Sequence, residues 1–137
     1  GDLRRGRAFL VAQMAMVPPM QVAGVKFLVG TDTSNEAWVF AGDSTHREMA
    51  LFVEAGMSPL DALQAATLNP RRYLGRKTAT PLIAVGEWAD LVLLSKNPLE
   101  DINNTRTIEG VIARGVYNDR KALDALVAEA EATAKAH

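Results

Sequence analysis

A short apolar run between positions 25 and 29 ends at a glycine, a threonine and an aspartate. The sequence from Val25 reads VKFLVGTDT, so one polar residue interrupts the run. Such a run, broken by Gly30-Thr31-Asp32, predicts a buried β-strand with a carboxylate at its carboxyl end. Ligands and catalytic groups of α/β proteins collect at that end. Asp32 is accordingly either a metal ligand and general base, or a turn residue that caps the next segment.

The pattern before this run predicts two short helices. Apolar residues at helical spacing lie between Leu3 and Val17, and Pro18-Pro19 would stop the helix that they form. Pro19 suits the first turn of a second short helix, with Gly24 as its C-terminal cap. Helix, glycine and strand in this order form the αβ half of a barrel unit.

The segment 33–43 is polar and contains glycine, with Trp38 and Phe40 inside it. A loop of this length after a strand that carries a site usually covers the site. The two aromatic side chains either contact an apolar substrate or pack under their own loop, and the sequence leaves both open.

A helix is predicted next, capped by Ser44 or Thr45. Glu48 follows at the spacing of a capping box. The helix runs to Glu54 and stops at Gly56. Its apolar face consists of Met49, Leu51, Phe52 and Val53.

His46 lies in the first turn of that predicted helix, beside the end of the strand that carries Asp32. His46 is a candidate to hydrogen-bond a metal ligand without binding the metal itself, or to contact the substrate. Thr31 is a second candidate for the same roles. The alternative is a histidine that is bonded to a neighbouring carbonyl or carboxylate.

Two further helix starts are marked by proline. Ser58-Pro59 is a cap followed by proline at the first helical position, and Asn69-Pro70 repeats this arrangement. The second of these helices ends at Gly75.

After residue 76 the pattern changes to short apolar runs of the kind that form strands. The runs are 81–85, 91–95, 107–114 and 116–117, and Gly115 indicates a tight turn between the last two. The tail from 119 to 136 has leucine, valine and alanine at helical spacing between charged residues, which predicts an amphipathic helix.

Length and composition narrow the function classes. The chain has 137 residues, 48% of them hydrophobic and 23% charged, with a net charge of −1 and no cysteine. A core can form, disulfides and thiolate metal sites are excluded, and neither nucleic acid nor a membrane is an expected partner. No targeting segment or run of transmembrane length is visible, and a cytoplasmic location is favoured. A (β/α)8 barrel needs about 250 residues, so no complete barrel can form.

A family resemblance rests on several motifs in a fixed order. They are VKFLVGTDT from 25, STHREM from 44, VEAGMSPLDAL from 53, ATLNPRRYLG from 66, GEWADLVLL from 86 and NPLEDI from 97. Together they resemble the C-terminal third of metal-dependent amidohydrolases. The resemblance covers residues 24–118, and within the superfamily it is closest to imidazolonepropionase-like and Xaa-Pro dipeptidase-like members.

The resemblance implies a role for Asp32. In these enzymes the aspartate after the eighth barrel strand binds or faces the metal and shuttles the proton, and Asp32 occupies that position. It also implies zinc or another divalent metal in the complete protein. The family's His-x-His, its carboxylated lysine or glutamate and two further histidines have no counterpart here, because the two histidines are His46 and His137. This chain alone is therefore compatible with binding no metal.

The expected fold class is α/β. Residues 1–76 would form the end of the hydrolase barrel with its last strand, 77–118 the C-terminal part of a composite β-sandwich, and 119–137 a C-terminal helix. By the same resemblance Asp90 is a sandwich turn residue and structural. Expected partners are the N-terminal part of the same protein, a small-molecule substrate and further copies of the chain.

Two functions are compatible with this sequence. The first is part of an amidohydrolase that splits C–N bonds of cyclic amides or dipeptides with a metal-activated water and Asp32 as base. The second is a non-catalytic module that associates with itself through open strand edges.

Overall fold

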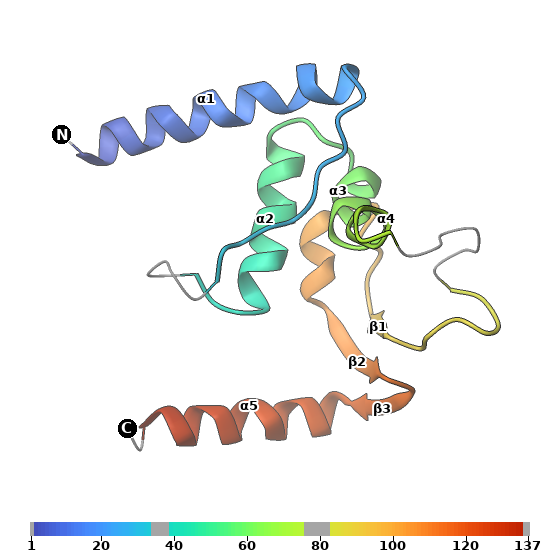
Figure 1. Ribbon diagram of the computed structural model, residues 1–137. Helices are drawn as coiled ribbons and strands as arrows, with labels where there is room; N and C mark the ends of the chain where they lie inside the picture. The colour runs from blue at the N-terminus through green and yellow to red at the C-terminus, as the bar shows by residue number, and fades with distance from the viewer. Residues whose placement is uncertain (1, 34–38, 76–82, 136–137) are drawn as a thin grey trace. The chain divides into compact units, whose positions relative to one another are not determined.

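A computed structural model describes residues 2–33, 39–75 and 83–135 (Figure 1). The chain divides into two compact units. The first comprises Gly1–Ala79 with Pro98–Asn103, and the second comprises Thr80–Asn97 with Asn104–His137. The helices and the small antiparallel sheet agree with the expected α/β class. No helix in the described ranges is long and apolar enough to cross a membrane.

The first unit begins with a single helix, α1 (Asp2–Val22), where two short helices were predicted. That prediction is wrong, because the helix continues through Pro18 and Pro19. A proline loses its own N–H bond, but its carbonyl still accepts, and the Pro19 carbonyl accepts from Ala23 N–H at 3.0 Å. The helix then stops at Gly24, as predicted, which has a φ of 82°.

Residues 25–29 follow in extended conformation but do not form the predicted buried β-strand. A strand needs a neighbour to complete its ladder, and in the described residues this segment bonds to helices instead. From position 27 to 33 its residues alternate between half-buried and exposed, which is the period of a strand. Phe27 and Val29 pack on the core, whereas Val25 and Leu28 are 42% and 36% exposed.

Helix α2 (Asp43–Glu54) starts without the predicted capping box. Its N-cap is Gly42, and no side chain caps it. The Ser44 hydroxyl accepts instead from the backbone N–H of Phe40 at 2.8 Å, and Glu48 bonds outside the helix. The C-terminal stop is the predicted one, because Gly56 has a φ of 102° and donates to the Val53 carbonyl at 3.0 Å.

Two short helices follow, α3 (Pro59–Ala66) and α4 (Leu68–Tyr73). The predicted cap of α3 is confirmed, because the Ser58 hydroxyl accepts from Asp61 N–H at 3.1 Å. Helix α4 begins before Asn69, so this asparagine is not the cap that the sequence suggested. It lies inside the helix and is only 9% exposed.

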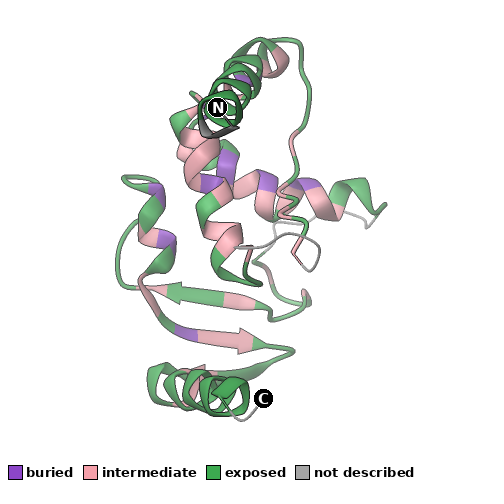
Figure 2. Cartoon of the chain, turned by 90° about the vertical axis from the view of Figure 1, so that its left-hand side faces the viewer, coloured by how far each residue is buried: buried purple, intermediate pink, exposed green. Residues whose placement is uncertain are grey.

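The core of the first unit lies where α1, α2 and α3 meet, and it includes one residue of the 3-10 helix η1 (Ile102–Arg106). Figure 2 marks the buried positions in purple. The buried cluster consists of Val17, Met49, Met57, Ala62 and Ile102.

The second unit is built on a three-stranded antiparallel sheet of order β1-β2-β3. The strands are β1 (Leu91–Leu94), β2 (Ile108–Ala113) and β3 (Val116–Asp119), as three of the apolar runs predicted. The run at 81–85 was also predicted to be a strand, and its described part, 83–85, is not one. Ile83 and Val85 are 76% and 107% exposed, so no packed surface supports a strand there.

The turn between β2 and β3 is the predicted tight hairpin. Arg114 and Gly115 both have positive φ, 51° and 81°, which is the pattern of a type I′ turn. The Asp90 carboxylate accepts from Arg114 N–H at 2.6 Å, and the Ala89 carbonyl accepts from Gly115 N–H at 3.0 Å. The bond to Arg114 N–H gives the Asp90 side chain a structural role at the hairpin turn.

The predicted amphipathic tail is helix α5 (Arg120–Lys135), which packs against β2 and β3. Asp119 caps it by accepting from Ala122 N–H at 2.8 Å. Leu126 and Val127 on the same helix remain 56% and 55% exposed.

Candidate functional site

Asp32 stands at the carboxyl end of the extended segment and is exposed to solvent. Its φ of 51° lies in the left-handed region, which costs energy for residues other than glycine, although less for aspartate than for most. Unusual backbone conformations of this kind gather at functional sites when the surroundings hold them in place. Contacts with α2, α3 and α4 fix the segment that ends at Asp32.

The carboxylate of Glu48 on α2 binds the backbone just before Asp32. The N–H of Gly30 donates to both carboxylate oxygens of Glu48, at 3.0 and 3.1 Å. Hydrogen bonds to a charged acceptor are about twice as strong as neutral ones. Residues 30 and 48 are joined across 18 positions of sequence, so this contact ties the end of the segment to α2.

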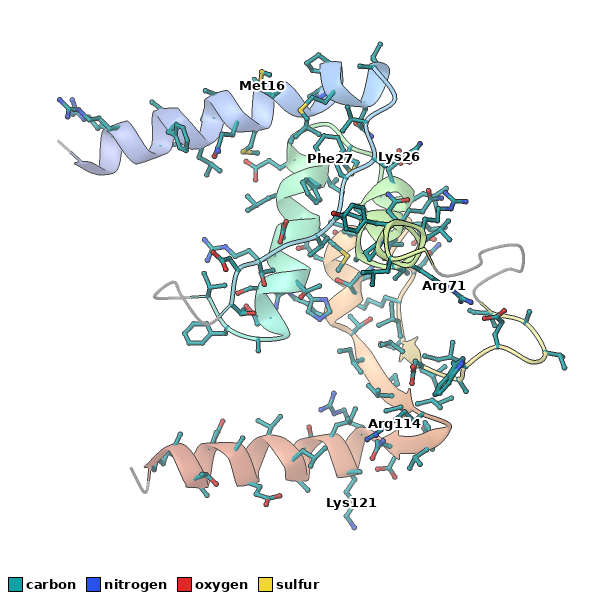
Figure 3. All side chains as sticks on the ribbon, in the orientation of Figure 1. Met16, Lys26, Phe27, Arg71, Arg114 and Lys121 are labelled. Atoms are coloured by element: carbon teal, nitrogen blue, oxygen red, sulfur yellow. The ribbon has the colours of Figure 1, made fainter. Side chains whose placement is uncertain are left out.

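One helical turn further along α2, Phe52 holds the middle of the segment. Its ring meets the ring of Phe27 edge to face, with centroids 5.6 Å apart and an interplanar angle of 66°. Figure 3 labels Phe27 on the segment beside α2. Because Glu48 and Phe52 are four residues apart, they lie on one face of the helix. That face positions the segment from residue 27 to residue 30.

Helices α3 and α4 hold the segment as well. The N–H of Val29 donates to the carbonyl of Ala65 at 3.0 Å. The buried side chain of Asn69 donates to the carbonyl of Phe27 at 3.0 Å. Three helices thus fix the backbone that leads to Asp32.

Thr31 adjoins Asp32 in the chain, and His46 lies near the start of α2. Thr31 and His46 are both half-buried. His46 precedes Glu48 by two positions, so the two side chains leave α2 about 200° apart. Phe40 is 61% exposed, and Trp38 lies outside the described residues.

Two cavities of the first unit lie away from Asp32. One, of about 210 Å³, is lined by residues of the helices and of the start of the segment, among them Gln21 on α1, Lys26 on the segment and Asn69 on α4. The other, of about 480 Å³, lies between α2 and the 100–103 stretch. Neither has Asp32 in its wall, so the site is defined by its contacts rather than by an enclosed volume.

The donor set around Asp32 fits one ligand of a metal ion and not a whole site. A catalytic zinc typically takes about three protein ligands. Among the described residues, no group of three or more histidine, aspartate and glutamate side chains could hold a metal ion. The remaining ligands of such a site would have to come from elsewhere in a complete protein.

Two contributors to this geometry were not recognised from the sequence. Glu48 was predicted to cap its own helix, and Asn69 was predicted to open one; both bind the extended segment instead. A signal for Glu48 was present, because it shares a helix face with Phe52, which the pattern placed in the core.

Comparison with known proteins gives a family match over most of the chain. The protein-family model described as the amidohydrolase family matches residues 2–117 of this chain. Ochratoxinase from Aspergillus niger is 40% identical over 82 residues, which are 58% of this chain and 16% of that protein. Adenine deaminase 3 from Rhizobium meliloti is 28% identical over 95 residues, 68% of this chain and 16% of that protein.

Solved structures agree with these matches. A Xaa-Pro dipeptidase with methionine bound in its active site aligns with a TM-score of 0.65 and 29% identity, over 77% of this chain and 25% of that one. Phenylurea hydrolase B aligns with a TM-score of 0.53 and 40% identity, over 59% and 18%. The chain thus spans between 16% and 25% of the length of these relatives.

Proposed function

The chain belongs to the amidohydrolase family, and on that premise we propose that it is the C-terminal part of an enzyme that hydrolyses C–N bonds. The observation that carries the proposal is the family match over residues 2–117, with 40% identity to ochratoxinase and phenylurea hydrolase B over more than half of the chain. The partner of this part would be the N-terminal part of the same protein.

Within that enzyme we assign residues 25–32 to the last strand of a (β/α)8 barrel. The strand-like alternation from 27 to 33 and the exposed side chains of Val25 and Leu28 support this assignment. Neighbouring barrel strands would pair with the segment and cover its exposed face. The sheet β1-β2-β3 would be the C-terminal part of a small β-sandwich.

Asp32 would then be the carboxylate that faces the reacting bond. A divalent metal, when bound, supplies Lewis acidity that lowers the pKa of a water molecule. Asp32 would contribute one ligand to it, take a proton from the water and deliver that proton to the leaving nitrogen. Its solvent-exposed side chain at the end of the extended segment is suited to both transfers. Thr31 and His46 remain candidates for contact with the substrate.

The named activities of the relatives suggest the substrate class. The four relatives are named for ochratoxin, phenylurea, adenine and Xaa-Pro dipeptides. We expect a small molecule with a C–N bond to an amide, urea, cyclic amide or amidine carbon.

The proposal is tested with the complete protein on a panel of these compounds and a cyclic amide. We expect at least one to be hydrolysed, with turnover lost after dialysis against a chelator and restored by a divalent cation. Hydrolysis that survives metal removal would contradict the metal-dependent mechanism. Failure to hydrolyse any C–N bond would contradict the proposed activity itself.

A second function is favoured by the open edges of the chain. Leu28 is 36% exposed, and its backbone has no hydrogen bond to any other described residue. On β1, an edge strand, Val92 and Leu93 are 55% and 44% exposed. Apolar edges of this kind pair readily with another chain, so the chain alone would act as a self-associating module.

We therefore expect the isolated chain to be a dimer or larger at micromolar concentration. Light scattering measures this directly. Leu28→Lys and Val92→Lys place a charge on each edge and should shift the population toward monomer. Leu126→Lys, at an apolar position on α5 about as exposed as Val92, is the matched control. A wild-type chain that is monomeric would rule out the self-associating module.

A further inference from the structure

We propose that Glu48 is a positioning residue for Asp32, acting through the backbone N–H of Gly30. This inference rests on the proposed function of Asp32 and adds a second carboxylate to that site. The two carboxylates have different tasks: Asp32 handles the proton, and Glu48 fixes the backbone from which Asp32 projects.

The contact geometry supports a clamp on the backbone rather than a loose surface contact. One N–H lies between two carboxylate oxygens at nearly equal distances, 3.0 and 3.1 Å. This arrangement fixes the direction of the N–H as well as its distance, because displacement toward either oxygen lengthens the other bond. Glu48 is half-buried and the bond is exposed to solvent, so the restraint comes from the paired contact rather than from burial.

The clamp holds the chain two residues before a strained position. Asp32 has a φ of 51°, and such a conformation persists only where the surroundings fix it. Phe27, Val29 and Gly30 are each tied to a helix, and the Glu48 contact is the one nearest to Asp32 among those described above. Loss of this bond would remove the tie between Gly30 and α2, while Phe27 and Val29 keep theirs.

In the described residues, no steric clash requires a glycine at position 30. A Cβ added at Gly30 would meet no atom within 4 Å, and the φ of Gly30 is outside the positive range. Among the described residues, the part of Gly30 that makes a printed contact is its N–H.

The test uses Glu48→Ala and Glu48→Gln in the complete protein. A catalytic group displaced by about 1 Å can cost about 10²-fold in rate, so we expect Glu48→Ala to lower kcat by about 10- to 100-fold. KM should change by less than about 3-fold, because Glu48 contacts the backbone and not the substrate. The glutamine keeps one acceptor oxygen for Gly30 N–H, so Glu48→Gln should retain more activity than Glu48→Ala.

A matched control comes from the same helix. Glu54 is an exposed carboxylate at the other end of α2, and Glu54→Ala should leave kcat and KM unchanged. Thermal melting of every variant separates loss of activity from loss of folding. If Glu48→Ala does not fold, Glu48→Gln decides the question, because it preserves the size of the side chain.

A double-mutant cycle with Asp32→Asn distinguishes positioning from a general structural role. If Glu48 acts through Asp32, adding Glu48→Ala to Asp32→Asn should lower kcat by less than about 2-fold further. Additive losses, or a Glu48→Ala enzyme with wild-type kcat, would overturn the inference while leaving the role of Asp32 intact. A wild-type kcat for Asp32→Asn would instead overturn the proposed base, and the inference with it.

Discussion

Replacing Asp32 by asparagine in the complete enzyme should lower kcat by about 10²–10⁴-fold, which is the contribution of a general base. Loss of a metal contact would add to this. Asparagine has nearly the same shape but cannot accept the proton, so the fold should persist. The measurement is kcat on the substrate identified from the panel, with the metal content and melting temperature of the same sample.

Asp90→Asn is the matched control for that experiment. Asp90 is also an exposed aspartate, but its carboxylate accepts from Arg114 N–H at the hairpin turn. We expect this variant to keep its kcat and most of its stability, because the asparagine carbonyl oxygen can still accept from Arg114 N–H. A near-wild-type kcat for Asp32→Asn would make Asp32 a turn residue, which is the other role that the sequence allowed.

The features that the sequence predicted correctly depend on neighbours within a few residues. Ser58 caps α3 because Pro59 follows it and Asp61 supplies the N–H. The turn at Arg114-Gly115 forms because two residues separate paired strands, so that Ala113 lies opposite Val116. Gly24 and Gly56 end helices because glycine adopts a positive φ at little cost.

The features that the sequence predicted wrongly depend on distant atoms. Glu48 had the spacing to cap its own helix, but the N–H of Gly30, 18 positions away, receives it instead. The run at 25–29 had the composition of a strand, but a ladder requires a second strand beside it. Helix α1 passes through Pro18-Pro19 and packs against α2, a contact that local propensity does not include.

The candidate site shows the same division. Asp32 could be named from the order of motifs, because it follows an apolar run and precedes a loop and a helix. Its left-handed backbone and the clamp by Glu48 could not, because both are properties of the folded contact between the segment and α2. The sequence thus indicated a candidate carboxylate and not the second carboxylate, Glu48, that bonds the backbone before it.

The chain on its own should show no hydrolase activity, which is an effect as large as the catalysis itself. A water-activating metal site needs about three protein ligands. Among the described residues no group of three candidate ligands comes together, so Asp32 lies in no such set. The purified chain, supplied with Zn²⁺ and assayed on an Xaa-Pro dipeptide and on the substrate of the complete enzyme, should give no turnover above the rate without protein.

Metal analysis of the same sample should find less than one ion per chain after gel filtration, because one carboxylate in water binds a divalent cation weakly. The complete enzyme in the same buffer is the positive control. Turnover by the isolated chain that Asp32→Asn abolishes would contradict this prediction directly. Such turnover would mean that several copies of the chain together supply the missing ligands, since the described residues of one chain have too few. The ratio of metal to chain would then give the number of copies that share one ion.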